Sequence, residues 1–291
     1  MKYEFPEILV ETIINSYFDY DVNENDYPNK ISVTSLIDAP YIQKMKKYYT
    51  KDLKHKLATD KKFALEFAKK NWWIILGKAV HSLLEEMPGV RFTKEKRLNM
   101  DFLGTIITGK WDLYDHVEKE IPDYKVTSKY TVTNEERLHD YYWQLNILRY
   151  IAKSHNYEVD KLSLIFICRD LMPQDKYTDK FPENALVKLP VPIFPDNKIE
   201  EFIKSRIEYH KSYERQNGCD MYERWGKPDT WAVIKEGAKT AYKVLKSEFE
   251  ATELAKSKKG YNVEFRPAED TRCKNYCDFN IFCTFYKEKY G

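Results

Sequence analysis

Apolar residues in the first third of the chain recur at helical spacing. Over residues 6–18 the positions 9, 13, 14 and 18 are apolar, which predicts a short acidic helix. A polar, turn-rich connector follows over 19–30, and a lysine-rich helical stretch comes after it. The apolar pattern over 61–86 predicts a long buried helix that ends at Pro88 and Gly89.

The pattern changes after residue 90, where Val, Ile, Thr, Tyr and Phe become frequent. Three consecutive strands are predicted, over 90–98, 102–115 and 118–126. Their short connections indicate an antiparallel meander. A helical pattern then runs over 134–154, and the apolar run 162–168 is typical of a buried strand. This order of helix, three strands, helix and strand predicts a mixed α/β (α+β) core.

The remaining residues predict additions to that core. We expect a strand over 186–194 and helices over 197–216 and 231–257, whereas the last thirty residues read as irregular. Only 9 glycines and 12 prolines leave little material for linkers. We therefore predict one domain, 1–291, with four parts: an acidic N-terminal helix and connector (1–30), a core (31–170), a mostly helical extension (171–258) and a cysteine-rich lobe (259–291).

The composition predicts a folded chain without a membrane span. Apolar residues make up 43% of the sequence, and the longest uncharged apolar runs, 72–77 and 162–168, are far shorter than the roughly 20 residues that a spanning helix needs. Glu4, Glu7 and Glu11 interrupt any secretory signal. We therefore expect a cytoplasmic protein without a membrane partner, whose cysteines bind metal or stay reduced.

The net charge of +2 hides a strong segregation of charge. Residues 1–30 hold seven acids and two lysines, whereas residues 43–70 hold ten lysines and three acids. The basic stretch fits either a polyanion such as nucleic acid or a solvated helix face. The candidate phosphate contacts in it are Lys44, Lys46, Lys47 and Lys51, with Lys54 beside them. Tyrosines and tryptophans could stack on single strands, but Trp72 and Trp73 read as buried helix residues, so no single aromatic is assigned that role.

A possible metal site is indicated by His81, Asp112, Asp123 and Lys125. The two aspartates lie on successive predicted strands, and pairing of those strands would bring like charges together at a cost that a divalent cation relieves. Mg²⁺ or Mn²⁺ prefers oxygen ligands, and His81 could add nitrogen. Lys125 would share a strand face with Asp123 and could orient an attacking water. Each residue alone also fits a structural role, but their joint order favours a site.

These residues carry a family resemblance. Gly77…His81, Gly109-x-x-Asp112, Pro122-Asp123-Tyr-Lys125 and Gln144-Leu145 resemble the PD-(D/E)XK nuclease superfamily, specifically its RecB-like branch of CRISPR-associated and phage exonucleases. The resemblance covers about residues 31–170 and implies a restriction-endonuclease-like core with helical additions. It implies metal binding by His81, Asp112 and Asp123, assistance from Lys125, and Gln144 beside them.

Two positions depart from the pattern of the branch. Leu148 stands where the branch usually has a tyrosine four residues after the glutamine, which leaves Tyr150 as the nearest candidate to contact nucleic acid. Ala39 stands where cluster-bearing relatives have a cysteine. A cluster in this chain therefore needs its fourth ligand from elsewhere.

The C-terminal cysteines follow a C-x3-C-x5-C pattern at Cys273, Cys277 and Cys283. Zinc or a cubane cluster ordinarily takes four such ligands. We expect Cys219 as the fourth, because its segment resembles a Cys…Glu-Arg-Trp segment of phage relatives, whereas Cys168 in an apolar strand reads as a small buried hydrophobe. The resemblance implies [4Fe-4S], the spacing leaves Zn²⁺ open, and either would pin the tail to the core.

The resemblance also implies a function. It predicts a divalent-metal-dependent DNA exonuclease, bacterial or phage-encoded and acting in the cytoplasm, that hydrolyses single-stranded DNA or DNA ends in recombination, repair or phage DNA processing. A catalytically silent nucleic-acid-binding module and a CRISPR adaptation nuclease remain as alternatives. The intact Asp123-x-Lys125 pair argues against the silent module.

Overall fold

The computed structural model describes residues 5–19, 29–86, 89–178, 180–212 and 218–291. The chain divides into two compact units, a first unit (1–216) and a second unit (217–291), each of which is described by itself. The boundary falls inside the extension predicted over 171–258. Most of the predicted connector (20–28), Pro88 and the end of the helix predicted to reach Gln216 lie outside the described residues.

Helices form most of the described chain before residue 87. They are α1 (Glu7–Phe18), α2 (Val33–Ile37), α3 (Pro40–Thr59), α4 (Lys61–Asn71) and α5 (Trp73–Glu85). The helix predicted over 6–18 and the lysine-rich helix are confirmed. Side-chain oxygens start two of these helices, because Ser32 accepts the Ser35 N–H and Asp60 accepts the Phe63 N–H.

The prediction of one long buried helix over 61–86 is wrong. The segment forms two helices, α4 and α5, and none of the residues of α5 is buried. α5 contacts α1 and β6 (Glu120–Thr127), while Leu83 on it remains 67% exposed. An apolar helix next to the sheet is thus half-buried rather than fully covered in the first unit.

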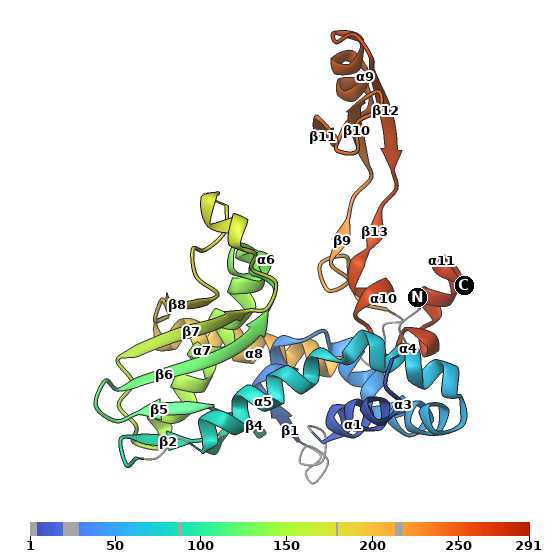
Figure 1. Cartoon of the computed structure of the whole chain (residues 1–291). Helices are drawn as coiled ribbons and strands as arrows, with labels where there is room; N and C mark the ends of the chain where they lie inside the picture. The colour runs from blue at the N-terminus through green and yellow to red at the C-terminus, as the bar shows by residue number, and fades with distance from the viewer. Residues whose placement is uncertain (1–4, 20–28, 87–88, 179, 213–217) are drawn as a thin grey trace. The chain divides into compact units, whose positions relative to one another are not determined.

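Two sheets organise the first unit (Figure 1). The larger sheet has the strand order β2 (Phe92–Lys94), β5 (Leu113–Asp115), β6, β7 (Lys161–Cys168) and β8 (Leu186–Val191). The smaller has the order β1 (Lys30–Ser32), β4 (Thr105–Lys110) and β3 (Arg97–Phe102). β6 pairs with β7 in parallel, β1 pairs with β4 in parallel, and the other neighbours are antiparallel. The strands predicted over 162–168 and 186–194 are confirmed.

Residues 90–115 form four short strands rather than parts of two long ones. Both arms of the hairpin are interrupted at the same level, one at Glu95 and Lys96 and the other at Trp111 and Asp112. The Glu95 N–H donates to the Asp112 carbonyl at 3.1 Å, and the Trp111 N–H donates to the Lys96 carbonyl at 3.3 Å. Glu95 has φ of 46°, in the left-handed region that side chains larger than glycine rarely adopt. The hairpin therefore bends here.

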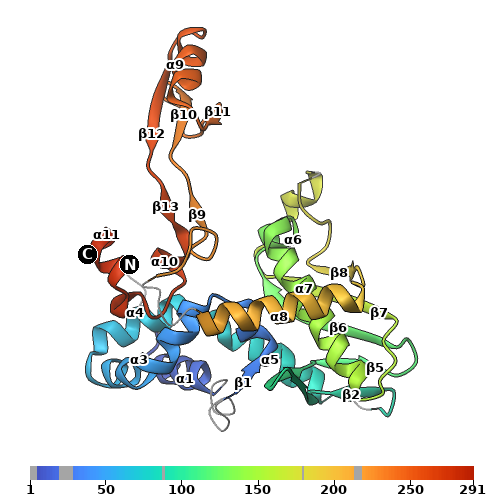
Figure 2. The ribbon, with the colours of Figure 1, turned by 180° about the vertical axis from the view of Figure 1, so that it is seen from behind.

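Helices α6 (Lys129–Val132), α7 (Glu135–Ser154) and α8 (Asp196–Ser212), with a 3₁₀ turn at Pro173–Tyr177, complete the first unit. α7 packs on the strands and α8 packs on α7 (Figure 2). The fully buried side chains between these layers include Trp111, Ile121, Ile147, Phe166 and Ile203. The predicted mixed α/β class is confirmed, and Cys168 is a buried core residue as expected.

The second unit contains an insert, residues 230–266, that the sequence analysis assigned wrongly. In place of the helix predicted over 231–257 lie β10 (Thr230–Lys235), β11 (Lys243–Leu245) and α9 (Glu248–Lys256), and β12 (Tyr261–Arg266) follows. The strands form an antiparallel sheet of order β11-β10-β12. Val233 on β10 packs against Ala251 and Ala255 of α9, so tertiary packing overrides the helix propensity of the Ala-, Lys- and Glu-rich sequence.

The rest of the second unit, residues 218–229 and 267–291, is named the cysteine lobe. Its elements are β9 (Gly226–Lys227), β13 (Glu269–Asp270), α10 (Thr271–Asn275), a 3₁₀ turn at Asn280–Phe282 and α11 (Thr284–Tyr290), so the tail is more helical than the irregular one expected. In the described parts of the chain, we find no helix with the length and apolar character needed to cross a membrane.

Candidate metal centre

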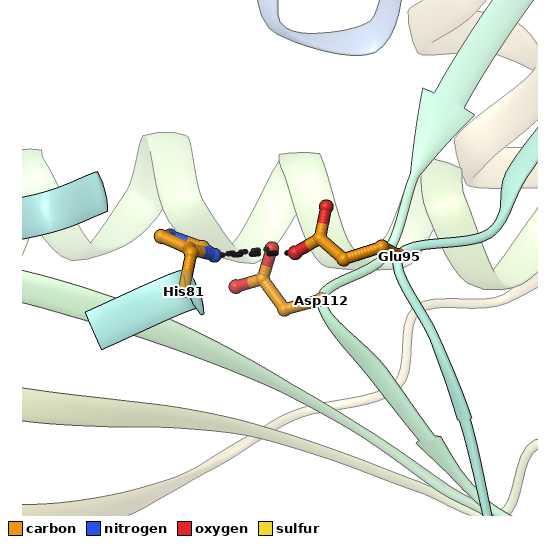
Figure 3. A group of neighbouring side chains, drawn as sticks. All are labelled: His81, Glu95 and Asp112. Carbon is orange, nitrogen blue, oxygen red and sulfur yellow. Dashed lines mark hydrogen bonds and ion pairs between the residues drawn. The ribbon is translucent and has the colours of Figure 1, made fainter. Parts of the chain in front are cut away.

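Three side chains from three separate elements converge in the first unit (Figure 3). His81 comes from α5, Glu95 from the break between β2 and β3, and Asp112 from the break between β4 and β5. Their ligand atoms all lie within 4.8 Å of one another. His81 Nδ1 lies 3.3 Å from Glu95 Oε1 and 3.5 Å from Asp112 Oδ1. The bend in the hairpin thus supplies both carboxylates.

Asp123 and Lys125 on β6 adjoin this group. The Tyr124 N–H donates to Asp112 Oδ2 at 3.0 Å, so the Asp112 carboxylate takes the place of a strand acceptor at the edge of β6. Lys125 Nζ lies 2.6 Å from Asp123 Oδ2. That oxygen is buried and receives no hydrogen bond of good geometry, despite the nearby ammonium. The structure therefore brings together the four residues that the sequence pattern singled out: His81, Asp112, Asp123 and Lys125.

The electrostatics of the group are those of crowded carboxylates. Burial, and next the negative charge of Asp123, raise the pKa of Asp112 to about 6. Burial lowers the pKa of Lys125, but the charges of Asp123 and Asp112 outweigh it and raise the pKa overall. The hydrogen bond to Glu95 raises the pKa of His81. Burial raises the pKa of Glu95, but hydrogen bonds from His81 and Lys110 hold it below its ordinary value.

These residues form a donor set that fits a hard divalent cation. Lys110 pairs with Glu95 and Lys125 pairs with Asp123, whereas Asp112 has no lysine or arginine ion pair among the described residues. The cluster thus keeps an excess of negative charge when His81 is neutral. One imidazole nitrogen and several carboxylate oxygens, one of them buried without a good hydrogen bond, suit Mn²⁺ or Mg²⁺.

The sequence analysis missed Glu95. The left-handed backbone that turns its side chain toward His81 leaves no mark in the residue pattern. One signal was present: Lys94, Glu95, Lys96 and Arg97 place four consecutive charges inside the segment predicted as a strand. Such a run does not alternate between a buried and an exposed face, which favours an interruption at this point.

Gln144 and Tyr150 point in different directions from α7. Gln144 is half-buried and lies three residues after Tyr141, whose ring centre is 5.3 Å from Lys125 Nζ, so both lie on the helix face toward the site. The Tyr150 hydroxyl donates to Glu200 of α8 at 2.5 Å, and burial, with that contact, raises its pKa to about 12. The structure therefore holds Tyr150 against α8. The lysine candidates lie on α3, with Lys47 and Lys51 exposed and Lys44 and Lys46 half-buried.

In the second unit, all four predicted cluster ligands are half-buried cysteines that form no disulfide, Cys219, Cys273, Cys277 and Cys283. Burial, then the neighbouring Cys277, raises the pKa of Cys273 to about 12. Burial is also the largest cause of the raised pKa of Cys219, to which Cys273 and Cys277 contribute. Cys219, predicted from its Cys…Glu-Arg-Trp segment, thus lies near Cys273 and Cys277, and Cys283 lies near Cys273.

Comparisons with known proteins leave the family open. No protein-family model matches the chain, and no curated protein matches it. Three similar solved structures are SSO0001, with 16% identity, a TM-score of 0.47 and coverage of 75% of this chain and 92% of that chain, and two exonucleases. The phage-related exonuclease from Haemophilus somnus 129PT has 14% identity, a TM-score of 0.32 and coverage of 72% of this chain and 81% of that chain. The candidate exonuclease from Eubacterium rectale has 16% identity, a TM-score of 0.32 and coverage of 76% of this chain and 73% of that chain. At these identities and TM-scores the functional argument rests on the site itself.

Proposed function

We propose that the chain is a divalent-metal-dependent DNA nuclease whose centre is formed by His81, Glu95, Asp112 and Asp123. The observation that carries the proposal is the convergence of three metal-ligand atoms within 4.8 Å, next to a buried Asp123–Lys125 pair. Structural ion pairs are usually balanced within themselves. This group instead buries the Asp112 carboxylate next to that of Asp123, and burial first, then the Asp123 charge, raises the pKa of Asp112 to about 6, a cost that a folded chain accepts where a cation binds.

The residues of the chain take distinct roles in this proposal. His81, Asp112 and Asp123 bind the metal, and Glu95 either joins them or orients His81 through its contact with Nδ1. A bound Mg²⁺ or Mn²⁺ would supply Lewis-acid activation of water and phosphate. Lys125 keeps its proton, because Asp123 and Asp112 raise its pKa, and its ammonium offsets charge that develops on phosphate oxygens. Gln144 lies on the same side of α7 as Tyr141 and lines the site.

We further propose that the substrate is DNA with a free end, cut to 5′-phosphorylated products during recombination, repair or phage DNA processing. The lysines of α3 would contribute phosphate contacts without base specificity. Linear and circular single strands of the same sequence separate the activities, because an exonuclease leaves the circle intact. A CRISPR adaptation role shares this chemistry and differs in its partners.

We further propose that the four cysteines of the second unit bind a [4Fe-4S] cluster, with zinc as the alternative. Cys273 and Cys277 contribute to the raised pKa of Cys219, and Cys277 and Cys283 contribute to that of Cys273, so the thiols are neighbours. Four cysteine thiolates are the ligand set of both groups, and the resemblance of these segments to cluster-bearing relatives favours iron. Anaerobically purified protein should therefore be brown and contain iron and sulfide.

The decisive experiment compares Asp112→Ala with the wild type on end-labelled DNA in Mg²⁺, in Mn²⁺ and in EDTA. Wild type should degrade DNA only with metal, and the variant should lose about 10³-fold in rate, since a metal ligand supports several kcal/mol of transition-state stabilisation. Glu208→Gln on the exposed side of α8 is the matched control. Equal degradation by Asp112→Ala and wild type would refute the proposal, and metal-independent binding without cleavage would favour the silent module.

A further inference from the structure

Two lysines pair with carboxylates of the candidate metal centre, and their surroundings differ. Lys125 pairs with Asp123 on the same strand, and its side chain is 22% exposed. Lys110, the last residue of β4, pairs with Glu95 Oε2, and its side chain is 39% exposed. Lys125 is therefore held inside the centre, whereas Lys110 lies at its more open margin.

Lys110 takes one of the two oxygens of the Glu95 carboxylate. The other oxygen, Oε1, lies 3.3 Å from His81 Nδ1 and belongs to the group of converging ligand atoms, as Figure 3 shows. Because both oxygens belong to one carboxylate, an ammonium on Oε2 and a divalent cation at Oε1 would repel each other at short range. Lys110 and the cation should therefore compete for Glu95.

The charges of the centre agree with such a competition. When His81 is neutral, the charged groups are three carboxylates, Glu95, Asp112 and Asp123, and the two lysines. With both lysines in place, a divalent cation exceeds the remaining negative charge. Without Lys110 the carboxylates and Lys125 balance a divalent cation, and the Lys110 ammonium is left beside them without a counter-charge. A phosphodiester group of the substrate carries the charge that it then lacks.

The hairpin bend around Lys110 is rich in cations that have neutral partners. Lys94 Nζ donates to the Glu85 carbonyl at 3.1 Å, and Lys96 Nζ donates to the Tyr157 hydroxyl at 2.6 Å. Among the residues that the structure describes, Lys110 pairs with no carboxylate other than Glu95. This margin of the centre therefore favours an anion as the next partner of the displaced ammonium, and lysine is a common phosphate contact.

We propose that Lys110 competes with the divalent cation for Glu95 and, once displaced, binds a phosphate of the DNA, so that Lys110 couples metal binding to substrate binding. The inference deepens the proposed function and rests on it for the identity of the substrate. Because coupling between two ligands is reciprocal, DNA that holds Lys110 raises the affinity of the centre for metal by the same factor. The centre therefore binds metal most tightly when DNA is in place.

The first test reads metal affinity apart from cleavage. Lys110→Met removes the ammonium and keeps an unbranched side chain. Calorimetric titration of the full-length protein with Mn²⁺ at pH 8 should show affinity about fivefold higher than in wild type, the upper size for a half-exposed charge pair. Lys110→Arg keeps the charge and should bind Mn²⁺ as wild type does. Loss of a merely structural residue would lower the affinity, so the sign of the change separates the two roles.

The second test reads DNA binding with and without metal. In EDTA, Lys110 stays on Glu95, so Lys110→Met should bind a labelled single-stranded oligonucleotide within about twofold of wild type by fluorescence anisotropy. In saturating Mn²⁺, KM should rise about fivefold while kcat stays within about twofold, the pattern for loss of a contact made equally in ground and transition states. The slope of log KM against log salt should fall by about 0.7, the loss of one phosphate contact on a single strand, and Lys110→Arg should keep it.

A matched control removes a similar ion pair elsewhere in the same sheet. Lys188 on β8 is 58% exposed, and its Nζ lies 2.8 Å from the Glu120 carboxylate, which is 9% exposed. Lys188→Met should keep the Mn²⁺ affinity, the KM and the salt dependence of wild type. Circular dichroism melts identify a variant that fails to fold, and Lys110→Gln then takes the place of Lys110→Met.

The outcomes separate this inference from the nuclease proposal. Unchanged or lower Mn²⁺ affinity in Lys110→Met overturns the competition even if wild type degrades DNA as proposed. Equal losses of DNA affinity in EDTA and in Mn²⁺ would make Lys110 a permanent phosphate contact and overturn the coupling. Absence of cleavage by wild type in Mg²⁺ and Mn²⁺ overturns the nuclease. Anisotropy in Mn²⁺ then replaces KM, and a metal-dependent loss of DNA affinity in Lys110→Met leaves the coupling standing.

Discussion

The two groups of candidate metal ligands differ in what holds them in place. Two ligands of the first unit, Glu95 and Asp112, lie on a hydrogen-bonded hairpin bend next to fully buried residues, such as Trp111, which directly precedes Asp112. The cysteines of the second unit lie in a lobe whose buried residues, within the described chain, are Glu223, Asp270 and Phe279. The first group therefore has an apolar core beneath it, whereas the second has mainly polar support.

This difference predicts different dependence on metal. The hairpin bend and helix α5 bring His81, Glu95 and Asp112 together at the cost of crowding negative charge, so we expect them to stay assembled without a cation. Burial raises the pKa of the Cys219 and Cys273 thiols, so these two stay protonated at neutral pH until a metal displaces the protons. We therefore expect metal binding at the cysteines to stabilise the folded lobe, whereas metal binding in the first unit should affect catalysis and leave the fold unchanged.

The largest expected effect follows from removing one cluster ligand. Cys277→Ser should lower bound iron from about four atoms to less than one per chain. Because little apolar burial remains to hold the lobe, we expect backbone amides of 218–229 and 267–291 to exchange with solvent more than about a hundredfold faster. The amides of β6 and β7 should keep their exchange rates. Hydrogen exchange read by mass spectrometry, with iron analysis, tests both.

Cys168→Ala is the matched control, since it removes a thiol that is buried in β7 rather than in the lobe. It should retain all the iron and destabilise the first unit alone. Faster exchange throughout the first unit in Cys277→Ser would show that the two regions do not differ as argued. A colourless wild type that contains zinc would contradict the cluster assignment while leaving the coupling intact.

The next effect concerns the polar support of the lobe. Asp270 is 3% exposed and is contacted by Arg224 Nε at 3.0 Å, Lys289 Nζ at 2.7 Å and the Tyr290 hydroxyl at 2.9 Å. Asp270→Asn leaves these cations without their counter-charge. We expect the free energy of unfolding of the lobe to fall by about 3 kcal/mol, the low end for breaking a buried pair, because Lys289 is partly exposed.

Thermal melts followed at the cluster absorbance measure this loss, with the exposed Glu288→Gln on α11 as the control. If Asp270→Asn and the wild type have the same melting temperature, the cluster alone stabilises the lobe. The difference between the two regions would then be larger than argued above, because the polar network would add nothing measurable to the stability of the lobe.

The sequence predicted which residues of the first unit come together better than it predicted the backbone that places them. Histidine, two aspartates and a lysine in a fixed order marked the site, because their residue types carry the chemistry. The sequence analysis missed Glu95 because its side chain is directed toward the site by a left-handed φ, which the bend in the hairpin imposes. The apolar run of α5 predicted burial, but periodicity does not tell what covers a helix, and Trp73 is exposed.

In the second unit the sequence analysis assigned the secondary structure of a whole segment wrongly. The spacing of the cysteines identified the lobe, yet the segment 231–257 was predicted as helix because Ala, Lys and Glu favour helices locally. The strand β10 forms because Val233 packs on α9 and pairs with Val263, a partner thirty residues away. Non-local pairing of this kind is invisible to a local pattern.

A smaller effect, on Mn²⁺ affinity, tests whether Glu95 at the bend binds the metal itself or positions His81. Glu95→Gln removes the charge that faces His81 and Lys110 but keeps the size of the side chain. We expect Mn²⁺ affinity, measured by calorimetry on metal-free protein, to fall about tenfold, in the range found when a partner of a metal ligand is lost. Iron content and amide hydrogen exchange in the cysteine lobe should not change, because we expect the two metal sites to be independent.

Glu208→Gln again serves as the control, since its carboxylate is exposed on α8. Wild-type Mn²⁺ affinity in Glu95→Gln would mean that Glu95 serves only to balance Lys110. A loss far above a hundredfold would instead make Glu95 a direct ligand on a par with Asp112.

The smallest effect is in pH dependence, where the two units differ because all six histidines lie in the first. His210 Nε2 donates to the Leu36 carbonyl at 3.0 Å, and burial, with the nearby Arg206 charge, lowers the pKa of His210 to about 4. Below its unfolded pKa of about 6.5 the unfolded chain binds the proton preferentially. This residue therefore makes the first unit lose stability as pH falls from 6.5 toward 4, by at most about 1.4 kcal/mol per pH unit.

His210→Gln isolates that contribution, because glutamine retains an N–H donor for Leu36 but does not titrate. His81, whose pKa is raised, acts in the opposite direction in both proteins and cancels from the difference between them. At pH 7.5 the two proteins should be within about 0.5 kcal/mol, and at pH 5 the variant should gain up to about 2 kcal/mol relative to wild type, as read from exchange of α2 and α8 amides in urea. The same difference at both pH values would mean that folding does not lower the pKa of His210. The cysteine lobe, which has no imidazole, should show no variant-dependent change.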